Sequence, residues 1–167
     1  MRKTSNQVRI IGGRLRGRKL AFPDSPGLRP SPDRVRETLF NWLAPSLAGA
    51  RCLDLFAGSG ALGIEALSRG GRTLTMIDSQ RDVCSQLESS IERLALTAVR
   101  VICADASSWL RHAPDLPFDV VFVDPPYQSN LLHPILTLLA QKLSHGVLIY
   151  WEHPAGQTLA LPERLTI

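Results

Sequence analysis

The sequence predicts an α/β domain in which a mostly parallel sheet carries helices on both faces. From residue 51 onward, short apolar runs typical of strands alternate with longer amphipathic stretches typical of helices, as in successive βαβ units. Val120 to Val123 form a continuous apolar run, which is expected of a strand buried on both faces of a parallel sheet. The chain of 167 residues has the length of one domain.

Positive charge is concentrated at the N-terminus. Seven of the 19 Lys and Arg residues lie within the first 20 positions, where there is no Asp or Glu, while the remainder holds 12 basic and 15 acidic residues. A near-neutral body with a cationic N-terminal segment indicates a polyanionic partner. We therefore divide the chain into a basic hairpin with its linker, residues 1–30, and a main domain, residues 31–167.

Residues 8–22 are expected to form a β-hairpin around the pair Gly12-Gly13. Arginines at every second position of the second strand would project from one face, with Leu15 on the other. Such a row suits phosphate contacts, whereas a solvated tail or protection of a sheet edge is the alternative. The residues expected to contact a nucleic acid are Arg9, Arg14, Arg16, Arg18 and Lys19.

A helix is predicted to follow the Pro-, Gly- and Ser-rich linker at 23–32. Ser31 is expected to be its N-cap and Pro32 its first residue. Arg36 would lie on the solvated side. The apolar face would consist of Val35, Leu39, Trp42 and Leu43.

The remaining elements follow from the alternating pattern. Strands are expected at 51–56, 73–77, 99–103, 119–123 and 146–151. Helices are expected near 61–68, 79–96, 106–111 and 131–143. Ser79, with Asp82 three residues later, resembles a capping box that would open the second of these helices. Glu152, at the end of the last strand, could line the site, but a solvated strand-end acid is the expectation.

A glycine-rich turn follows the first of these strands. Gly58, Gly60 and Gly63 form GxGxxG, which allows a tight turn, close approach of a ligand to the backbone and packing of a helix on the sheet. Asp78 lies 20 residues after Gly58, where an acid can bond a ribose hydroxyl. Enzymes that use NAD and enzymes that use S-adenosylmethionine share these features.

Asp54 favours the second cofactor. An acid directly ahead of the glycines would repel a pyrophosphate but suits the ammonium of a methionine moiety. Asp105, beside Ala106 at the end of the third strand, could accept from an adenine amine, although a helix N-cap is the simpler role for this residue alone. Acids at successive strand ends predict a site for adenine, ribose and an ammonium without phosphate.

The tetrapeptide Asp124-Pro125-Pro126-Tyr127 follows the fourth strand of this region. Proline cannot donate a ladder hydrogen bond, so the strand must stop there. An acid, fixed carbonyls and an aromatic ring then stand at a strand's carboxyl end, where open α/β sheets bind ligands. These groups suit a planar guest bearing an NH2 group; a simple Asp-Pro turn is the alternative.

These motifs resemble those of class I amino-methyltransferases, and the resemblance narrows at the N-terminus. Arg9-Ile-Ile-Gly-Gly-Arg14, Arg34-Val-Arg-Glu37 and Leu39-Phe-Asn-Trp-Leu43 resemble the family of bacterial 16S ribosomal RNA guanine-N2 methyltransferases (RsmD). The resemblance covers roughly residues 8–152. It implies a Rossmann-like fold, S-adenosylmethionine as cofactor, and a guanine of 16S rRNA within a small-subunit assembly particle as substrate.

The resemblance also implies roles for particular residues. The catalytic residues would be Asp124, Pro125, Pro126 and Tyr127. The cofactor would be bound by Asp54, Phe56, Ala57, Gly58, Ser59, Gly60, Asp78, Ser79, Asp105, Ala106 and Asp124. Sheets of this class normally close with an antiparallel hairpin, strands six and seven. The chain ends on Leu165-Thr166-Ile167, which we expect within strand six, so strand seven is expected to be missing.

Other properties limit the setting. Cys52, Cys84 and Cys103 include no CxxC pair, and Cys52 and Cys103 fall in apolar runs, which predicts buried free thiols in a reducing compartment and no metal site. No secretory signal or membrane-length apolar run is present. A cytoplasmic monomer is therefore expected.

Several alternatives remain open at this point. A DNA adenine-N6 or cytosine-N4 methyltransferase, or a protein glutamine methyltransferase, would share the chemistry of the Asp-Pro-Pro-Tyr motif, although no separate DNA-recognition domain is evident. An NAD-dependent oxidoreductase would share the glycine turn. A non-catalytic RNA-binding assembly factor would keep the fold alone.

Overall fold

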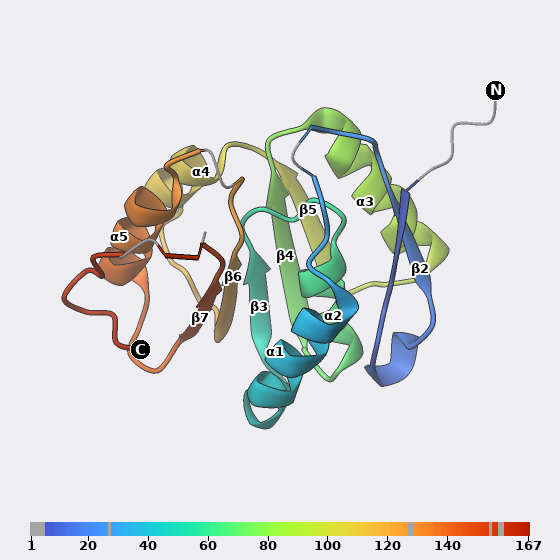
Figure 1. Ribbon diagram of the computed structural model, residues 1–167, viewed down its shortest axis with the longest axis horizontal. Helices are drawn as coiled ribbons and strands as arrows, with labels where there is room; N and C mark the ends of the chain where they lie inside the picture. The colour runs from blue at the N-terminus through green and yellow to red at the C-terminus, as the bar shows by residue number, and fades with distance from the viewer. Residues whose placement is uncertain (1–5, 27, 127–128, 154, 157–158) are drawn as a thin grey trace.

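A computed structural model describes residues 6–26, 28–126, 129–153, 155–156 and 159–167 (Figure 1). The strands are β1 (Asn6–Arg9), β2 (Lys19–Phe22), β3 (Arg51–Asp54), β4 (Thr73–Asp78), β5 (Val99–Cys103), β6 (Val120–Val123) and β7 (Leu148–Trp151). The helices are η1 (Gly13–Leu15), α1 (Asp33–Leu47), α2 (Ala61–Ser68), α3 (Arg81–Arg93), α4 (Ala106–His112) and α5 (Leu132–Lys142).

The main sheet has the order β5-β4-β3-β6-β7, and every neighbouring pair is parallel. The chain runs outward from β3 to β5 and then returns to the other side of β3 to form β6 and β7. The topological switch point therefore lies between β3 and β6, which is where open α/β sheets place their ligands. The predicted parallel α/β fold is confirmed.

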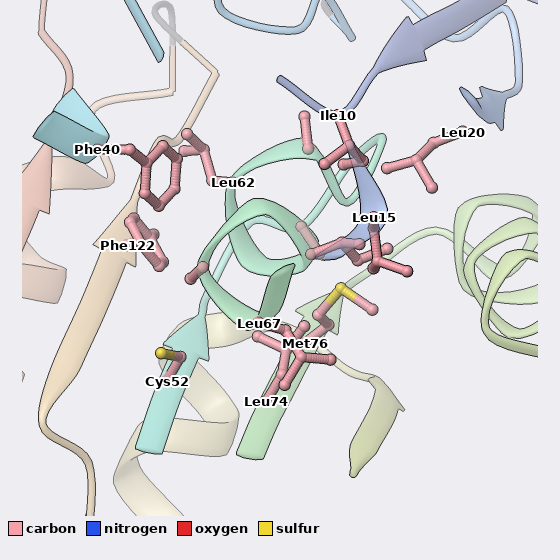
Figure 2. Close-up of a cluster of buried hydrophobic side chains, with 14 of the residues drawn as sticks. Ile10, Leu15, Leu20, Phe40, Cys52, Leu62, Leu67, Leu74, Met76 and Phe122 are labelled. Carbon is pink, nitrogen blue, oxygen red and sulfur yellow. The ribbon is translucent and has the colours of Figure 1, made fainter. Parts of the chain in front are cut away.

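Alternating strand residues belong to two hydrophobic clusters on opposite faces of the sheet, because successive side chains of a strand point to opposite sides. One cluster contains Cys52 and Phe122 of the sheet and is covered by α1, α2, α3 and the hairpin. The other contains Leu53 and Val121 and is covered by α4 and α5. Figure 2 shows that the hairpin's Ile10, Leu15 and Leu20 belong to the first cluster, so the hairpin is packed onto the domain.

The hairpin is confirmed as the antiparallel pair β1–β2, but its turn differs from the prediction. Residues 14–18 are not in a strand: η1 and a long loop occupy this stretch, and Arg14, Arg16 and Arg18 are exposed loop residues. Part of this stretch is bonded to α2 and not to the opposite strand: the Ser68 Oγ atom accepts from the Leu15 amide at 2.9 Å, and Glu65 accepts from the amides of Ile11 and Gly12. Only glycine fits at position 13, where a Cβ atom would lie 2.0 Å from the Ser68 carbonyl oxygen.

The predicted faces of α1 require a correction. Leu39 and Leu43 are buried as expected, but Val35 is 44% exposed and Trp42 is 75% exposed. Arg36, predicted to be solvated, is completely buried, because Glu65 of α2 lies opposite it and supplies a carboxylate partner. The burial of a charged pair between two helices thus sets the rotation of α1.

Two predicted helix caps are also wrong. Pro32, not Ser31, is the N-cap of α1, and the Ser31 hydroxyl donates to Glu152 instead. Gln80 is the N-cap of α3 without a side-chain cap, so the predicted capping box of Ser79 is not formed. Helix α3 consequently begins at Arg81.

The seven strands among the described residues include the two of the hairpin, so β7 is the fifth strand of the main sheet. Leu165 to Ile167, predicted to belong to a sixth sheet strand, are not in a strand; Leu165 packs against the second cluster instead. Cys103, predicted to be buried, is exposed, because β5 is the edge strand of the sheet. No helix among the described residues is long and apolar enough to span a bilayer.

Candidate active site

A cleft opens at the carboxyl edge of the sheet, at the switch point between β3 and β6. It contains about 950 Å³ of empty space, part of which is open solvent. Residues Asp54 and Phe122 are partners in the β3–β6 register, so Asp124 follows two residues beyond that pair at the same edge. Of the predicted cofactor residues, those that line the cleft are Asp54, Phe56, Ala57, Gly58, Ser59, Asp78, Ser79, Asp105, Ala106 and Asp124.

The glycine turn joins β3 to α2 beside this cleft. Gly58 has a φ of +51° and Gly60 a φ of +77°, in the left-handed region that glycine enters at little cost. The Gly60 amide donates to the Ala57 carbonyl at 2.7 Å, which closes the turn, and Gly60 is the N-cap of α2. Gly60 supports the turn and is not among the residues that line the cleft.

Gly63 lets α2 approach the sheet. A Cβ atom at this position would come within 2.8 Å of the Leu74 side chain and 3.2 Å of the Asp54 Oδ2 atom. The close approach brings the Gly63 amide to 3.1 Å from Asp54 Oδ2, to which it donates a hydrogen bond. The role predicted for the third glycine, packing of the helix on the sheet, agrees with this geometry.

Asp54 is a buried acid with one oxygen unsatisfied. Its side chain is 1% exposed, and the Oδ1 atom has no hydrogen-bond partner among the described residues. Burial raises the pKa of Asp54 to about 7, against the opposing effect of the Gly63 and Phe56 amides. A buried carboxylate oxygen without a donor is costly, so this atom is suited to a ligand that brings a positively charged donor.

Asp78 and Asp105 hold backbone amides at the cleft wall. Asp78 accepts from the Gly58 amide at 3.0 Å and from the Gln80 amide at 2.9 Å, so it ties the glycine turn to the start of α3. Asp105 caps α4 by accepting from the Ser108 amide at 2.7 Å. The simpler role considered for Asp105 is therefore present, and both acids still line the cleft.

The strand end after β6 places a second perturbed acid in the cleft. Burial, followed by the negative charges of Glu152 and Asp54, raises the pKa of Asp124 to about 7. Pro125 is buried and Pro126 is exposed, and the Pro126 carbonyl accepts from the amide of Ser129 at 2.9 Å. Tyr127, predicted to stack on the target, lies outside the described residues.

Sequence reasoning missed a third wall of the cleft. Five linker residues, which we call the strap, also line the cleft: Pro26, Leu28, Arg29, Pro30 and Ser31. A Cβ atom on Gly58 would lie 3.6 Å from Leu28, in ordinary contact. The high proline content of the strap is the one signal that could have indicated a fixed rather than a loose linker.

The structure does not bring the loop arginines to the cleft. Arg14, Arg16 and Arg18 lie around η1, which packs near Ser68 at the C-terminal end of α2, whereas the cleft is at the N-terminal end of that helix. The guanidinium of Arg9 already forms an ion pair with Asp33, at 3.0 Å. Lys19 is exposed next to Arg9 in the hairpin register.

The parallel sheet, the glycine turn and the acids at successive strand ends define a methyltransferase of class I, with the Rossmann-like fold. The sequence model of the family described as "Conserved hypothetical protein 95" matches residues 8–167. The chain belongs to this family, the ribosomal RNA small subunit methyltransferase D family. Among the described residues, no three His, Cys, Asp or Glu side chains are grouped as a metal site.

Individual relatives agree with this assignment. The chain is 52% identical to ribosomal RNA small subunit methyltransferase D of Escherichia coli strain K12 over 89% of this chain and 75% of that protein. The identity to the Haemophilus influenzae methyltransferase D is 43%, over 96% of this chain and 86% of that protein. The solved structure of the Escherichia coli protein yhhF has a TM-score of 0.81 at 47% identity, covering 95% of this chain and 87% of that one.

Proposed function

We propose that the protein transfers a methyl group from S-adenosylmethionine to the exocyclic N2 amine of a guanine in small-subunit ribosomal RNA. The observation that carries the proposal is the position of Asp124 and the glycine turn, which end neighbouring strands and open into one cleft. Membership in a family whose curated relatives are named ribosomal RNA small subunit methyltransferase D supports the class of acceptor.

The cofactor's sulfonium supplies an activated methyl group, so the protein's task is positioning and charge placement. Asp54 would hold the ammonium of the methionine part, Asp78 the ribose, and Asp105 with Ala106 the adenine. The strap would cover the bound cofactor, because Leu28 and Ser31 line the same cleft as these acids.

Asp124 would orient the acceptor amine. The lone pair of an exocyclic amine is delocalised into the base, so the nitrogen becomes a better nucleophile when its hydrogens are held out of the ring plane. The Asp124 carboxylate and the Pro125 carbonyl would accept hydrogen bonds from these two N–H groups and direct the nitrogen toward the methyl group. One proton must leave the nitrogen as the methyl group is transferred, and Asp124, whose pKa is raised to about 7, would accept it. A base paired or stacked within rRNA would first have to leave its stack.

Cofactor affinity is expected to depend on pH through Asp54. The ammonium favours the ionised carboxylate, whereas burial raises the pKa of Asp54 to about 7, so binding below pH 7 must release a proton. Affinity for S-adenosylhomocysteine should rise up to about tenfold per pH unit between pH 5.5 and 7 and level off above pH 8. Titration calorimetry across this range measures it. Asp54→Asn should bind more weakly and lose the slope; an equal slope in this variant excludes Asp54 as the titrating group.

The loop arginines are expected to contribute uniform, salt-dependent RNA affinity. Replacing Arg14, Arg16 and Arg18 together by alanine should reduce the slope of log affinity against log salt by about 2 to 3, because each phosphate contact releases counterions. Filter binding of small subunits at several salt concentrations gives this slope. Arg111→Ala on α4 serves as a control with the same charge change per residue. An unaltered slope in the triple variant would remove this loop from the RNA surface.

The class of molecule that accepts the methyl group can be tested by comparing substrates. Labelled S-adenosylmethionine is offered with small ribosomal subunits lacking the modification, naked 16S rRNA or duplex DNA, and incorporation is compared. The proposal predicts transfer to rRNA and none to DNA; transfer to DNA alone would contradict it. Parallel titrations with S-adenosylhomocysteine and NADH separate a methyltransferase from an oxidoreductase, since only the former should bind.

A further inference from the structure

The cleft carries one positive side chain among four acids. Of the described ionisable residues that line it, Arg29 of the strap is the only cation, and the others are Asp54, Asp78, Asp105 and Asp124. Arg29 is exposed, and it forms no ion pair with a described residue. Its guanidinium is therefore available to a ligand that occupies the cleft.

Arg29 lies between two points at which the strap is fixed. On one side, the Leu28 side chain lies against the glycine turn, where a Cβ atom on Gly58 would be 3.6 Å from it. On the other side, the Ser31 hydroxyl donates to Glu152, which is therefore not the solvated acid expected from the sequence. The residue between Arg29 and Ser31 is a proline, whose ring fixes the φ angle. The backbone at Arg29 is thus held next to the turn that joins β3 to α2.

A methionine moiety would bring two charges to this part of the cleft. S-adenosylmethionine and S-adenosylhomocysteine carry an ammonium and a carboxylate on the same carbon atom, so the two groups must bind side by side. In the proposed function Asp54 holds the ammonium. The carboxylate would be repelled by the acids of the cleft unless a positively charged donor faced it.

The start of α2, where an anion could otherwise bind, is already occupied. The Gly63 amide donates to Asp54 at 3.1 Å, and the Ala61 amide donates to the Ser59 hydroxyl oxygen at 3.3 Å. Asp54 thus brings an acid of the protein itself to this helix terminus. A carboxylate of the cofactor needs another donor, and Arg29 is the one cation among the described lining residues.

We propose that Arg29 is a cofactor-binding residue, whose guanidinium holds the α-carboxylate of S-adenosylmethionine through charge-assisted hydrogen bonds. The inference rests on the proposed function and adds to it the group that recognises the carboxylate of the cofactor. Asp54 and Arg29 together select a ligand that carries both an ammonium and a carboxylate. Nucleosides that lack either charge leave one of these two residues without a partner.

Titration calorimetry at about pH 8 compares S-adenosylhomocysteine with an analogue in which hydrogen replaces the α-carboxyl group. The analogue keeps the adenosine, the thioether and the ammonium. The wild-type protein should bind it about 5- to 30-fold more weakly than S-adenosylhomocysteine. Arg29→Ala should lose a similar factor for S-adenosylhomocysteine and about twofold or less for the analogue. Arg29→Lys, which keeps the charge but not the planar fork of donors, should lose a smaller factor.

Arg34→Ala is the matched control, because Arg34 is exposed on α1 and is not among the residues that line the cleft. It should bind both ligands as the wild-type protein does. An Arg29→Ala variant that keeps its S-adenosylhomocysteine affinity, or that binds both ligands more weakly by the same factor, overturns the role of Arg29 and leaves the proposed function standing. The role also fails if only the affinity for small ribosomal subunits falls, since Arg29 would then contact RNA. A wild-type protein that binds neither ligand overturns the proposed function and this inference with it.

Discussion

Replacing Asp124 by alanine is expected to lower methyl transfer by about 100- to 1,000-fold while S-adenosylhomocysteine binding is retained. The reason is that the carboxylate would accept from an amine only as that amine becomes nucleophilic, so its removal acts on the transition state. Burial already raises the pKa of this acid to about 7, so loss of the carboxylate should not weaken the fold. Single-turnover transfer of a labelled methyl group to small subunits measures the rate.

Asp124→Asn is a second test at the same position. The amide has the same size as the carboxylate, but its NH2 group is a hydrogen-bond donor and would repel the N–H groups of the target amine. Asp115→Asn, at an exposed acid in the segment before β6, provides a control with the same chemical change. Calorimetric titration with S-adenosylhomocysteine shows whether the cofactor site remains intact. An Asp124→Ala protein with wild-type turnover would remove this residue from the mechanism.

Replacing Glu65 by alanine is expected to lower the free energy of unfolding by about 3–5 kcal/mol, because it removes a buried partner of two cations. Buried Arg36 would keep only its 2.6 Å ion pair with Asp33, and Arg69 would lose the 2.8 Å ion pair with Glu65. Glu65 and Arg36 are both completely buried, with Arg36 NH1 at 3.4 Å from the Glu65 Oε2 atom. The same carboxylate accepts from the amides of Ile11 at 2.8 Å and Gly12 at 2.7 Å. These partly buried amides would also lose their partners, at a further cost.

Urea denaturation monitored by Trp fluorescence gives the stability change for Glu65→Ala. Arg36→Met in the same chain should recover part of the loss, because the completely buried cation is then removed together with its buried partner. Limited proteolysis should also cut residues 10–18 faster in the single variant, since Glu65 holds this loop to α2. A stability loss under 1 kcal/mol would mean that the buried pair contributes little to docking of the hairpin.

The strand and helix pattern of the main sheet could be predicted because its signals are local. Burial of a strand on both faces gives an apolar run, as at Val120–Val123. This pattern is required whichever helices cover the strand. The acids Asp54 and Asp124 could be placed together because parallel strands share one carboxyl edge. The raised pKa values of these two acids could not be predicted, because they depend on how deeply the folded chain buries each carboxyl group.

The misjudged features depend on contacts distant in sequence. The rotation of α1 follows from the pairing of Arg36 with Glu65, 29 residues away, and periodicity alone could not choose between the helix faces. The conformation of the loop after β1 depends on Glu65 and Ser68, more than 50 residues away, whose side chains accept hydrogen bonds from the loop amides. The position of the Glu152 side chain likewise depends on Ser31, 121 residues earlier in the chain.

The identity of the methylated atom tests the central claim most directly. Small subunits from a strain deleted for the homologous gene are incubated with the protein and S-adenosylmethionine, and the digested 16S rRNA is analysed by nucleoside mass spectrometry. We expect one N2-methylguanosine per subunit in addition to those found in untreated subunits. Methyl groups on an adenine or cytosine amine, or none at all, would contradict it.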